Sequence, residues 1–416
     1  MRTSVDLRTF VGSVPLPTPV LTASGTAGHG AELAAYIDLS TLGAVVVKSL
    51  SAHPWPGNRA PRVHETPAGM LNSVGLQGPG VAAWVARELP LLNDRGARVV
   101  ASIWGRSAQE YAQAASMLAG APGVIAVEVN VSCPNVEDRG RMFAHSAEAT
   151  AQAVSASAAC GLPLWVKLSP NTPDIIDIAG AALYAGAETL VLVNTVLGMA
   201  IDPRRRTYRL GSGPGGGGLS GPAIRPVAVR AVHDCRAAFP RVGIVGVGGV
   251  CRGVDVVEMM LAGADAVEVG TATFRDPRAP ARVLAGLKRW CRVHDVADVR
   301  SLVGAVHGTL GSATTAPMPA APVSEAPAPG APAPAVPVAP AVTAPAPSTA
   351  PPAPEPAGFS SPFTATPDRQ SVPAPAPAPV APPVRPRPGV VTRPDTSSRV
   401  PPLPPRRRPG TGGDHA

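Results

Sequence analysis

Residues 126–135 read AVEVNVSCPN, and this stretch decides the fold. Valines alternate with polar residues along it, which predicts a β-strand whose C-terminal end becomes polar. Pro134 disfavours a helical continuation at Cys133, so the strand end places a thiol between Asn130 and Asn135. A lone cysteine is usually a small buried apolar residue, but a thiol between two carboxamides also suits a proton acceptor beside a flat polar substrate.

Seven further segments carry a strand signal, and helical patterns separate them. The predicted strands span residues 20–23, 44–48, 98–103, 124–132, 162–168, 189–194, 242–247 and 266–269. Helical patterns cover residues 108–118, 147–159, 174–184, 223–239, 255–261 and 281–293, and residues 5–17 fit a hairpin. Strands that alternate with helices over this length predict an α/β fold, a (β/α)8 TIM barrel rather than an open doubly wound sheet.

The composition of the chain changes after residue 310. More than half of its 52 prolines lie in residues 317–416, with Ala, Ser and Thr and almost no large apolar residues. Such a segment cannot bury enough apolar surface to offset its ordering entropy. We therefore expect a catalytic barrel domain over residues 1–310 and a disordered Pro/Ala-rich tail over residues 311–416.

Charge and cysteine content argue against several function classes. The formal net charge is +8, but no basic stripe interleaved with aromatic residues indicates nucleic-acid binding. The five cysteines lack CxxC spacing, so neither a zinc site nor an iron–sulfur cluster is indicated, and we expect no metal. No apolar run reaches the ~18 residues of a membrane span, and no signal-peptide pattern is present. We therefore expect a cytoplasmic protein that does not bind membranes.

Polar residues and glycines follow nearly every predicted strand. In a barrel these strand ends lie on one face, where the following loops build the active site. Only three of the 36 Lys and Arg residues are lysines, and two of them close apolar runs, where a compact ammonium group serves better than a guanidinium. The strand-end residues are Ala23, Ser24, Gly25, Lys48, Asn130, Cys133, Lys167, Asn194, Thr195, Gly248, Gly249, Gly270 and Thr271.

Glycine-rich segments at 213–221, 246–249 and 269–272 indicate a phosphate site, with plain turns as the alternative. No GxxxxGK[ST] occurs and no GxGxxG follows the first strand, which argues against a nucleoside triphosphate or Rossmann dinucleotide site. A cofactor ring near Lys48, Lys167, Asn130 and Cys133 fits flavin mononucleotide (FMN). Pyridoxal phosphate is the competing interpretation, although it leaves the thiol unexplained.

Four carboxamides, those of Asn72, Asn130, Asn135 and Asn194, are predicted to lie on this face. A single Asn is an ordinary turn residue. Four together suit a substrate with alternating C=O and N–H groups, because each carboxamide both donates and accepts.

Several motifs together resemble the class 1 dihydroorotate dehydrogenases. They are LTASGTAGHG, KSLSAHPWPGNRAPR, ETPAGMLNSVGLQGPG, NVSCPN, WVKLSPN, LVNTVLGMAID, GGLSGPA, GVGGV and VGTATF, in the family's order over residues 15–290. The resemblance implies an FMN-containing (β/α)8 barrel that oxidises dihydroorotate to orotate in pyrimidine biosynthesis. Cysteine in place of the serine of class 2 resembles class 1, and GMLNSVGLQ resembles class 1B rather than the fumarate-using class 1A. Members of class 1B pass electrons to NAD+ through a subunit that carries FAD and a [2Fe–2S] cluster.

The resemblance also implies roles for individual residues. Cys133 would be the base that removes the C5 proton of dihydroorotate while hydride leaves C6. The implied substrate residues are Lys48, Asn72, Ser73, Val74, Gly75, Leu76, Asn130, Asn135, Asn194 and Thr195. The implied FMN residues are Ala23, Ser24, Gly25, Lys48, Asn130, Lys167, Gly221, Gly248, Gly249, Gly270 and Thr271.

Two alternatives stay open at this point. One is the flavin half of a dihydropyrimidine dehydrogenase, which shares an NxSCP-type loop, and the other is a non-catalytic scaffold barrel with an interaction tail. The resemblance implies a homodimer or a heterotetramer. The loop VEDRGRMFAHS after NVSCPN, an Arg-rich insertion at residues 204–206 and the tail depart from the family pattern.

Overall fold

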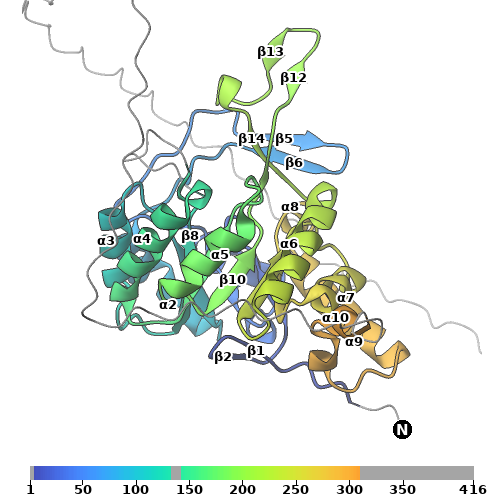
Figure 1. Ribbon diagram of the computed structural model, residues 1–416. Helices are drawn as coiled ribbons and strands as arrows, with labels where there is room; N and C mark the ends of the chain where they lie inside the picture. Colours follow the sequence, from blue (N-terminus) through green and yellow to red (C-terminus); the bar gives the residue numbers. More distant parts are fainter. Residues whose placement is uncertain (1–3, 133–141, 310–416) are drawn as a thin grey trace, which may run out of the picture. The chain divides into compact units, whose positions relative to one another are not determined.

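The computed structural model describes residues 4–132 and 142–309, which contain a parallel β-barrel (Figure 1). Eight strands form one sheet in the order β3-β16-β15-β10-β9-β8-β7-β4, and every pair in it is parallel. They are β3 (Val20–Thr22), β4 (Val45–Val46), β7 (Val99–Ile103), β8 (Val124–Asn130), β9 (Leu164–Leu168), β10 (Thr189–Leu192), β15 (Gly243–Val247) and β16 (Ala266–Val269). The predicted TIM barrel and its eight strands are confirmed.

The sheet closes on itself between β3 and β4. The Gly43 N–H donates to the Val20 carbonyl at 2.8 Å, and the Thr22 N–H donates to the Ala44 carbonyl at 3.3 Å. The buried Thr22 hydroxyl also accepts from the Val46 N–H at 2.9 Å and donates to the Val46 carbonyl at 3.3 Å. Closure leaves no strand of this sheet with an open edge.

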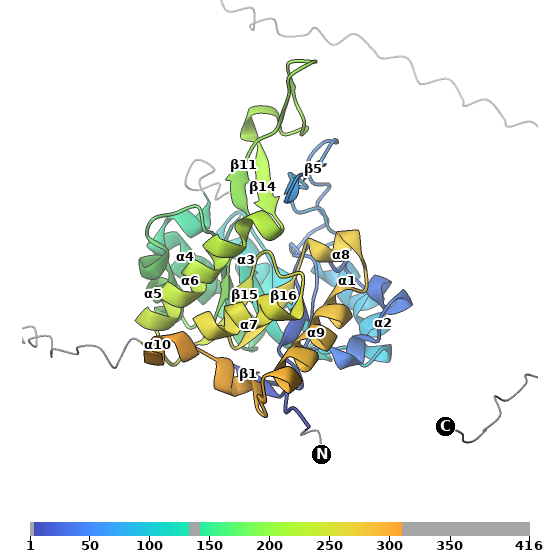
Figure 2. The ribbon, with the colours of Figure 1, turned by 90° about the vertical axis from the view of Figure 1, so that its right-hand side faces the viewer.

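Helices surround the barrel (Figure 2). The helices that follow its strands confirm the predicted helical segments: α3 (Ala108–Ser116), α4 (Ala147–Ser157), α5 (Ile175–Tyr184), α6 (Arg225–Ala238), α7 (Gly253–Ala262) and α9 (Ala279–Val293). Four further helices were not predicted, because they are too short to show a clear helical period: α1 (Val81–Arg87), α2 (Leu89–Asp94), α8 (Ala272–Arg275) and α10 (Ala305–Thr309). Short 3₁₀ turns are η1 (Glu32–Ala35), η2 (Leu39–Thr41), η3 (Phe143–His145), η4 (Ala158–Cys160), η5 (Gly213–Gly215), η6 (Pro222–Ile224) and η7 (Val299–Leu302).

Alternation along each strand separates an outer from an inner shell of side chains. In β8 the valines pack with the surrounding helices, so Glu128 and Asn130 face the barrel interior. The same alternation turns Lys167 of β9 and Glu268 of β16 inward. The interior therefore holds an apolar layer and, nearer the C-terminal strand ends, a charged one.

Two smaller sheets cover the ends of the barrel. A hairpin of β1 (Thr9–Val11) and β2 (Val14–Leu16) packs on the interior cluster at the N-terminal end, which confirms the predicted hairpin. At the other end, β5 (Val63–Thr66), β6 (Gly69–Asn72), β11 (Val196–Gly198) and β14 (Gly217–Ser220) form an antiparallel sheet, above which β12 (Ile201–Asp202) and β13 (Thr207–Tyr208) make a second hairpin (Figure 1). None of these four strands, nor the upper hairpin, was among the predicted strands.

Two of the predicted features lie outside the described residues, namely the C-terminal tail at 311–416 and most of the loop after NVSCPN. Within the described part, no helix is both long and apolar enough to cross a membrane.

Candidate active site

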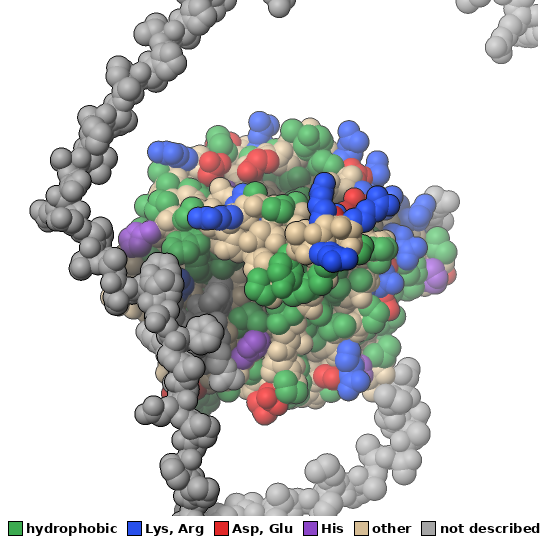
Figure 3. Space-filling model, turned by 90° about the horizontal axis from the view of Figure 1, so that it is seen from above, with side chains coloured by type: hydrophobic (Ala, Val, Ile, Leu, Met, Phe, Trp, Pro, Cys, Tyr) green, Lys and Arg blue, Asp and Glu red, His purple; other side chains and the backbone are tan. Residues whose placement is uncertain are grey.

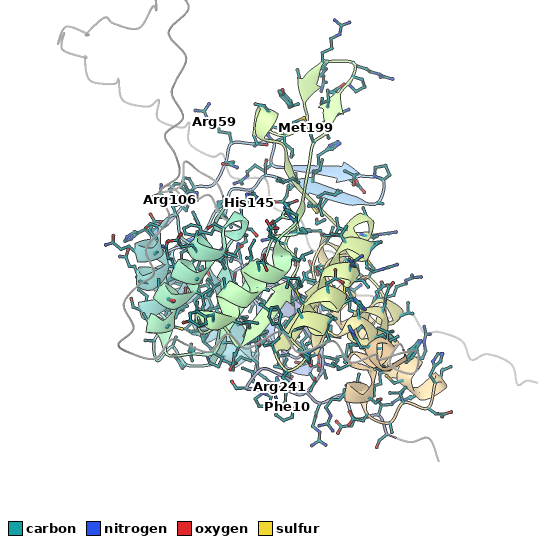
Figure 4. The ribbon with its side chains drawn as sticks, in the orientation of Figure 1. Phe10, Arg59, Arg106, His145, Met199 and Arg241 are labelled. Atoms are coloured by element: carbon teal, nitrogen blue, oxygen red, sulfur yellow. The ribbon has the colours of Figure 1, made fainter. Side chains whose placement is uncertain are left out.

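A cavity of about 540 Å³ opens at the C-terminal ends of the barrel strands, next to the antiparallel sheet (Figure 4 shows the side chains of this region). Every predicted site residue that the structure describes lines it: Ala23, Ser24, Gly25, Lys48, Asn72, Ser73, Val74, Gly75, Leu76, Asn130, Lys167, Asn194, Thr195, Gly221, Gly248, Gly249, Gly270 and Thr271. Cys133 and Asn135 lie outside the described residues. Strand ends far apart in sequence thus meet at one cavity, as the barrel requires.

Asn130 is the centre of a buried hydrogen-bond network at the end of β8. Its Nδ2 donates to Ser49 Oγ at 3.2 Å, while its Oδ1 accepts from Asn194 Nδ2 at 3.2 Å and from the Ser132 N–H at 3.1 Å. Ser49 Oγ in turn lies 2.8 Å from Ser102 Oγ. These contacts fix the orientation of the Asn130 carboxamide at the cavity.

Ser49, Ser132 and Asn171 also line this cavity, although none of them was a predicted site residue. Asn171 donates to the Thr195 carbonyl at 2.9 Å and accepts from the Leu197 N–H at 2.8 Å, and so holds the start of β11 in place. The two serines stand beside predicted residues in the chain. Asn171 follows a proline in WVKLSPN, a position where an Asn is typical of turns.

The antiparallel sheet brings Asn72 to the cavity. Its Nδ2 donates to the Gly218 carbonyl at 3.3 Å. A side chain at position 218 would collide with Thr195 Oγ1, so the glycine run allows β14 to lie close to the loop that follows β10. Of the four predicted carboxamides, the structure describes those of Asn72, Asn130 and Asn194, and all three residues line this cavity.

The loop after β15 is held in a fixed shape where it borders the cavity. The buried Asp255 carboxylate accepts from the Cys251 N–H at 2.9 Å and from the Arg252 N–H at 2.8 Å, and it pairs with Arg225 Nη1 at 2.7 Å. Gly249 has a φ of +75°, and a Cβ there would lie 2.6 Å from Arg225 Cβ. A side chain at Gly249 would therefore collide with α6, and the loop borders the cavity with Gly248 and Gly249.

Lys167 lies between the cavity and two buried carboxyl groups. Its Nζ is 2.7 Å from Glu268 Oε2, 3.4 Å from Glu128 Oε2 and 3.2 Å from Ser24 Oγ. Burial acts to lower the pKa of Lys167, but the two carboxylates outweigh burial and raise it, so the ammonium stays charged. Neither Glu128 nor Glu268 was a predicted site residue. Their only signal is one acidic residue among the valines of each strand.

Comparison with known proteins identifies the family. A family model described as dihydroorotate dehydrogenase matches residues 6–290. The chain is 45% identical over 299 residues to the dihydroorotate dehydrogenase B (NAD(+)), catalytic subunit, of Trichlorobacter lovleyi, which covers 72% of this chain and 97% of that protein. Subunits of the same name from Geotalea uraniireducens and Desulforamulus reducens are each 43% identical, over 72% and 73% of this chain and 98% and 99% of theirs. The chain belongs to the dihydroorotate dehydrogenase family, in its class 1B.

Proposed function

We propose that this chain is a catalytic subunit that oxidises (S)-dihydroorotate to orotate in pyrimidine biosynthesis. The observation that carries this proposal is the single cavity lined by all the described residues to which the resemblance gives substrate and cofactor roles. The relatives' name includes NAD(+) and the word subunit. We therefore also propose that electrons reach NAD+ through a partner subunit with FAD and a [2Fe–2S] cluster, in a heterotetramer or around a homodimer of this chain.

FMN is the cofactor that we propose for this cavity. The loop after β15 offers backbone at Gly248 and Gly249, both with positive φ, where a phosphate can approach closely, and barrels frequently bind phosphate beside their last two strands. A charged Lys167 suits a ring edge where negative charge develops. The same charge argues against pyridoxal phosphate at Lys167, because a Schiff base forms from the neutral amine.

Bound FMN supplies the acceptor for the hydride that leaves C6 of the substrate. Residues of this chain handle the substrate and the proton. We propose that Cys133, as a thiolate, takes the C5 proton. Asn72, Asn130 and Asn194 would orient the ring amides, and Lys48 would pair with the substrate carboxylate.

The outer face around the site also suits an anionic substrate. Lys and Arg side chains gather on part of the face seen from above (Figure 3). Arg204, Arg205 and Arg206, in the turn between β12 and β13, are exposed. A basic face raises the local concentration of a carboxylate substrate and its rate of encounter.

The test is to purify the full chain with its co-purifying proteins and to identify the bound cofactor by its spectrum and mass. Dihydroorotate is then assayed with NAD+, fumarate and quinone as acceptors. We expect FMN and turnover with NAD+ that depends on a second subunit. Activity on dihydrouracil and none on dihydroorotate would favour the dihydropyrimidine dehydrogenase alternative. A protein that binds no flavin and acts on neither substrate would favour the non-catalytic scaffold.

We also propose the division of the chain into an FMN-binding barrel over residues 1–310 and a separate tail over residues 311–416. The last described helix, α10, ends at Thr309, and the family match ends at residue 290. Limited proteolysis should then release the tail while the flavin stays bound. Loss of flavin on tail removal would contradict this division.

A further inference from the structure

Two acidic side chains are enclosed in the barrel beneath the cavity. Glu128 on β8 and Glu268 on β16 face inward, and both side chains are 0% exposed. Each has one oxygen, Oε2, near the Lys167 ammonium, at 3.4 Å and 2.7 Å respectively. The proposed contacts to substrate and cofactor use neither carboxyl group.

The charges of this cluster do not balance if all three groups are ionised. Two carboxylates would face one ammonium, and the second oxygen of each carboxyl, Oε1, has no hydrogen-bond partner within the described part of the chain. The neighbouring strands add no compensating charge, since β15 and β3 place Val247 and Leu21 inside the barrel and β7 places Ser102 there. A buried carboxylate without a partner is costly, and such a group takes up a proton instead.

We propose that Glu128 and Glu268 share one proton at neutral pH, which keeps the Glu128–Lys167–Glu268 cluster neutral and holds Lys167 as a charged donor at the floor of the cofactor cavity. Ser24 links the cluster to the cavity, because it lines the cavity and its hydroxyl oxygen lies 3.2 Å from Lys167 Nζ. Loss of the shared proton would leave one net negative charge beside Lys167. That charge would oppose the negative charge that a flavin gains on reduction. This effect on flavin reduction rests on the proposed function.

The direction of the pKa shift agrees with the geometry. Burial raises the pKa of Glu268 well above its usual range, Lys167 opposes the rise, and the neighbouring Glu128 adds to it. The charged groups that act on Glu268 are thus Lys167 of β9 and Glu128 of β8. Because the folded state holds this proton more tightly than the unfolded chain, the stability it contributes is complete below the ordinary carboxyl pKa of 4.5 and is lost as the pH rises through the folded pKa.

The first experiment measures stability against pH without any cofactor. Glu268→Gln and Glu128→Gln each replace one carboxyl with a neutral amide of the same shape and leave one carboxylate to pair with Lys167. The exposed Glu148→Gln is the matched control. Urea unfolding of the full chain is followed from about pH 5 upward, where one extra proton in the folded state raises the unfolding constant up to about tenfold per pH unit.

We expect the unfolding constant of the wild type and of Glu148→Gln to rise with pH more steeply than that of Glu128→Gln and Glu268→Gln. Parallel pH curves for the wild type and the buried variants would overturn the shared proton. If one buried variant does not fold, the other carries the same test, because either substitution removes the need for the proton.

The second experiment measures the reduction potential of bound flavin over the same pH range. At alkaline pH we expect the two-electron reduction of Glu268→Gln to be at least about tenfold more favourable than that of the wild type, about 30 mV, with no difference at acidic pH. Equal potentials at every pH would overturn the link to the cofactor. A chain that binds no flavin yet shows the stability difference would refute the proposed function and would still support the shared proton.

Discussion

Replacing Gly249 with alanine tests whether the loop after β15 shapes the cofactor cavity. The φ of +75° is a left-handed conformation that costs an alanine about 1–2 kcal/mol. The new Cβ would also lie 2.6 Å from Arg225 Cβ and 3.1 Å from Arg225 Cα. Arg225 is held by Asp255 at 2.7 Å, so we expect the loop to move rather than α6. Overpacking of this kind costs about 1–3 kcal/mol, and the combined cost is about 2–5 kcal/mol.

Gly161→Ala is the matched control for this variant. Gly161 also has a positive φ, +65°, but a Cβ there would meet nothing within 4 Å. It therefore shares the backbone strain of Gly249→Ala and lacks the contact with Arg225. Comparing the two variants isolates the effect of moving the loop.

The assays are urea unfolding with and without FMN, and titration of flavin fluorescence. We expect Gly161→Ala to lose about 1–2 kcal/mol of stability and to keep the wild-type flavin affinity. Gly249→Ala should lose more, and it should bind flavin at least about tenfold more weakly, which is ~1.4 kcal/mol of the combined cost. If the two variants behave alike in both assays, the loop does not shape the cavity and the reasoning is refuted.

Three further substitutions test the proposed base, the substrate role of Asn130 and the closure of the barrel. Cys133→Ala should keep bound flavin, while stopped-flow reduction by dihydroorotate at neutral pH falls about 10²–10⁴-fold, and a wild-type rate would exclude the thiol as base. Asn130→Ala removes the described carboxamide hydrogen bonds to Ser49, Ser132 and Asn194, so it should cost about 2–4 kcal/mol in urea unfolding and raise the KM for dihydroorotate. An unchanged KM would contradict a substrate role. Thr22→Val removes the hydroxyl that hydrogen-bonds to both backbone groups of Val46, so it should lower the free energy of unfolding by about 2–4 kcal/mol and leave flavin affinity unchanged. An unchanged thermal midpoint would mean that these hydrogen bonds do not stabilise barrel closure.

The barrel could be predicted from the sequence because strand signals and strand-end chemistry agree. Each predicted strand is an apolar run, and the structure buries both of its faces. The outer face packs against helices, and the inner face packs in the barrel interior. Lys48, Asn130 and Lys167 end such runs, and parallel strands bring those ends to one face. The prediction therefore needed only local patterns and the rule that barrel strands are parallel.

The antiparallel sheet above the barrel could not be predicted in the same way. Its strands β6 and β14 join segments from two distant loops, and their residues, such as Gly69 and Gly217, are typical of turns. These segments form strands because the barrel fixes the loop ends close together. Glycine then permits the close approach that the pairing needs, as at Gly218 beside Thr195. The local sequence therefore predicts loops, and the tertiary structure overrides that preference.

The charge state of Lys167 depends on the closed barrel rather than on the sequence around it. Strand β9, which carries Lys167, pairs directly with β8, which carries Glu128. The contact between Lys167 and Glu128 would therefore also form in an open sheet. Glu268 lies on β16, which is separated from β9 by β10 and β15 in the strand order, and it reaches Lys167 at 2.7 Å only across the barrel interior. In an open sheet Glu268 would stand without this partner, and the two carboxyl groups would have no reason to share a proton. The pH dependence expected for Glu268→Gln is therefore also a test of barrel closure, because it requires strands that are not neighbours to place their side chains in one enclosed layer.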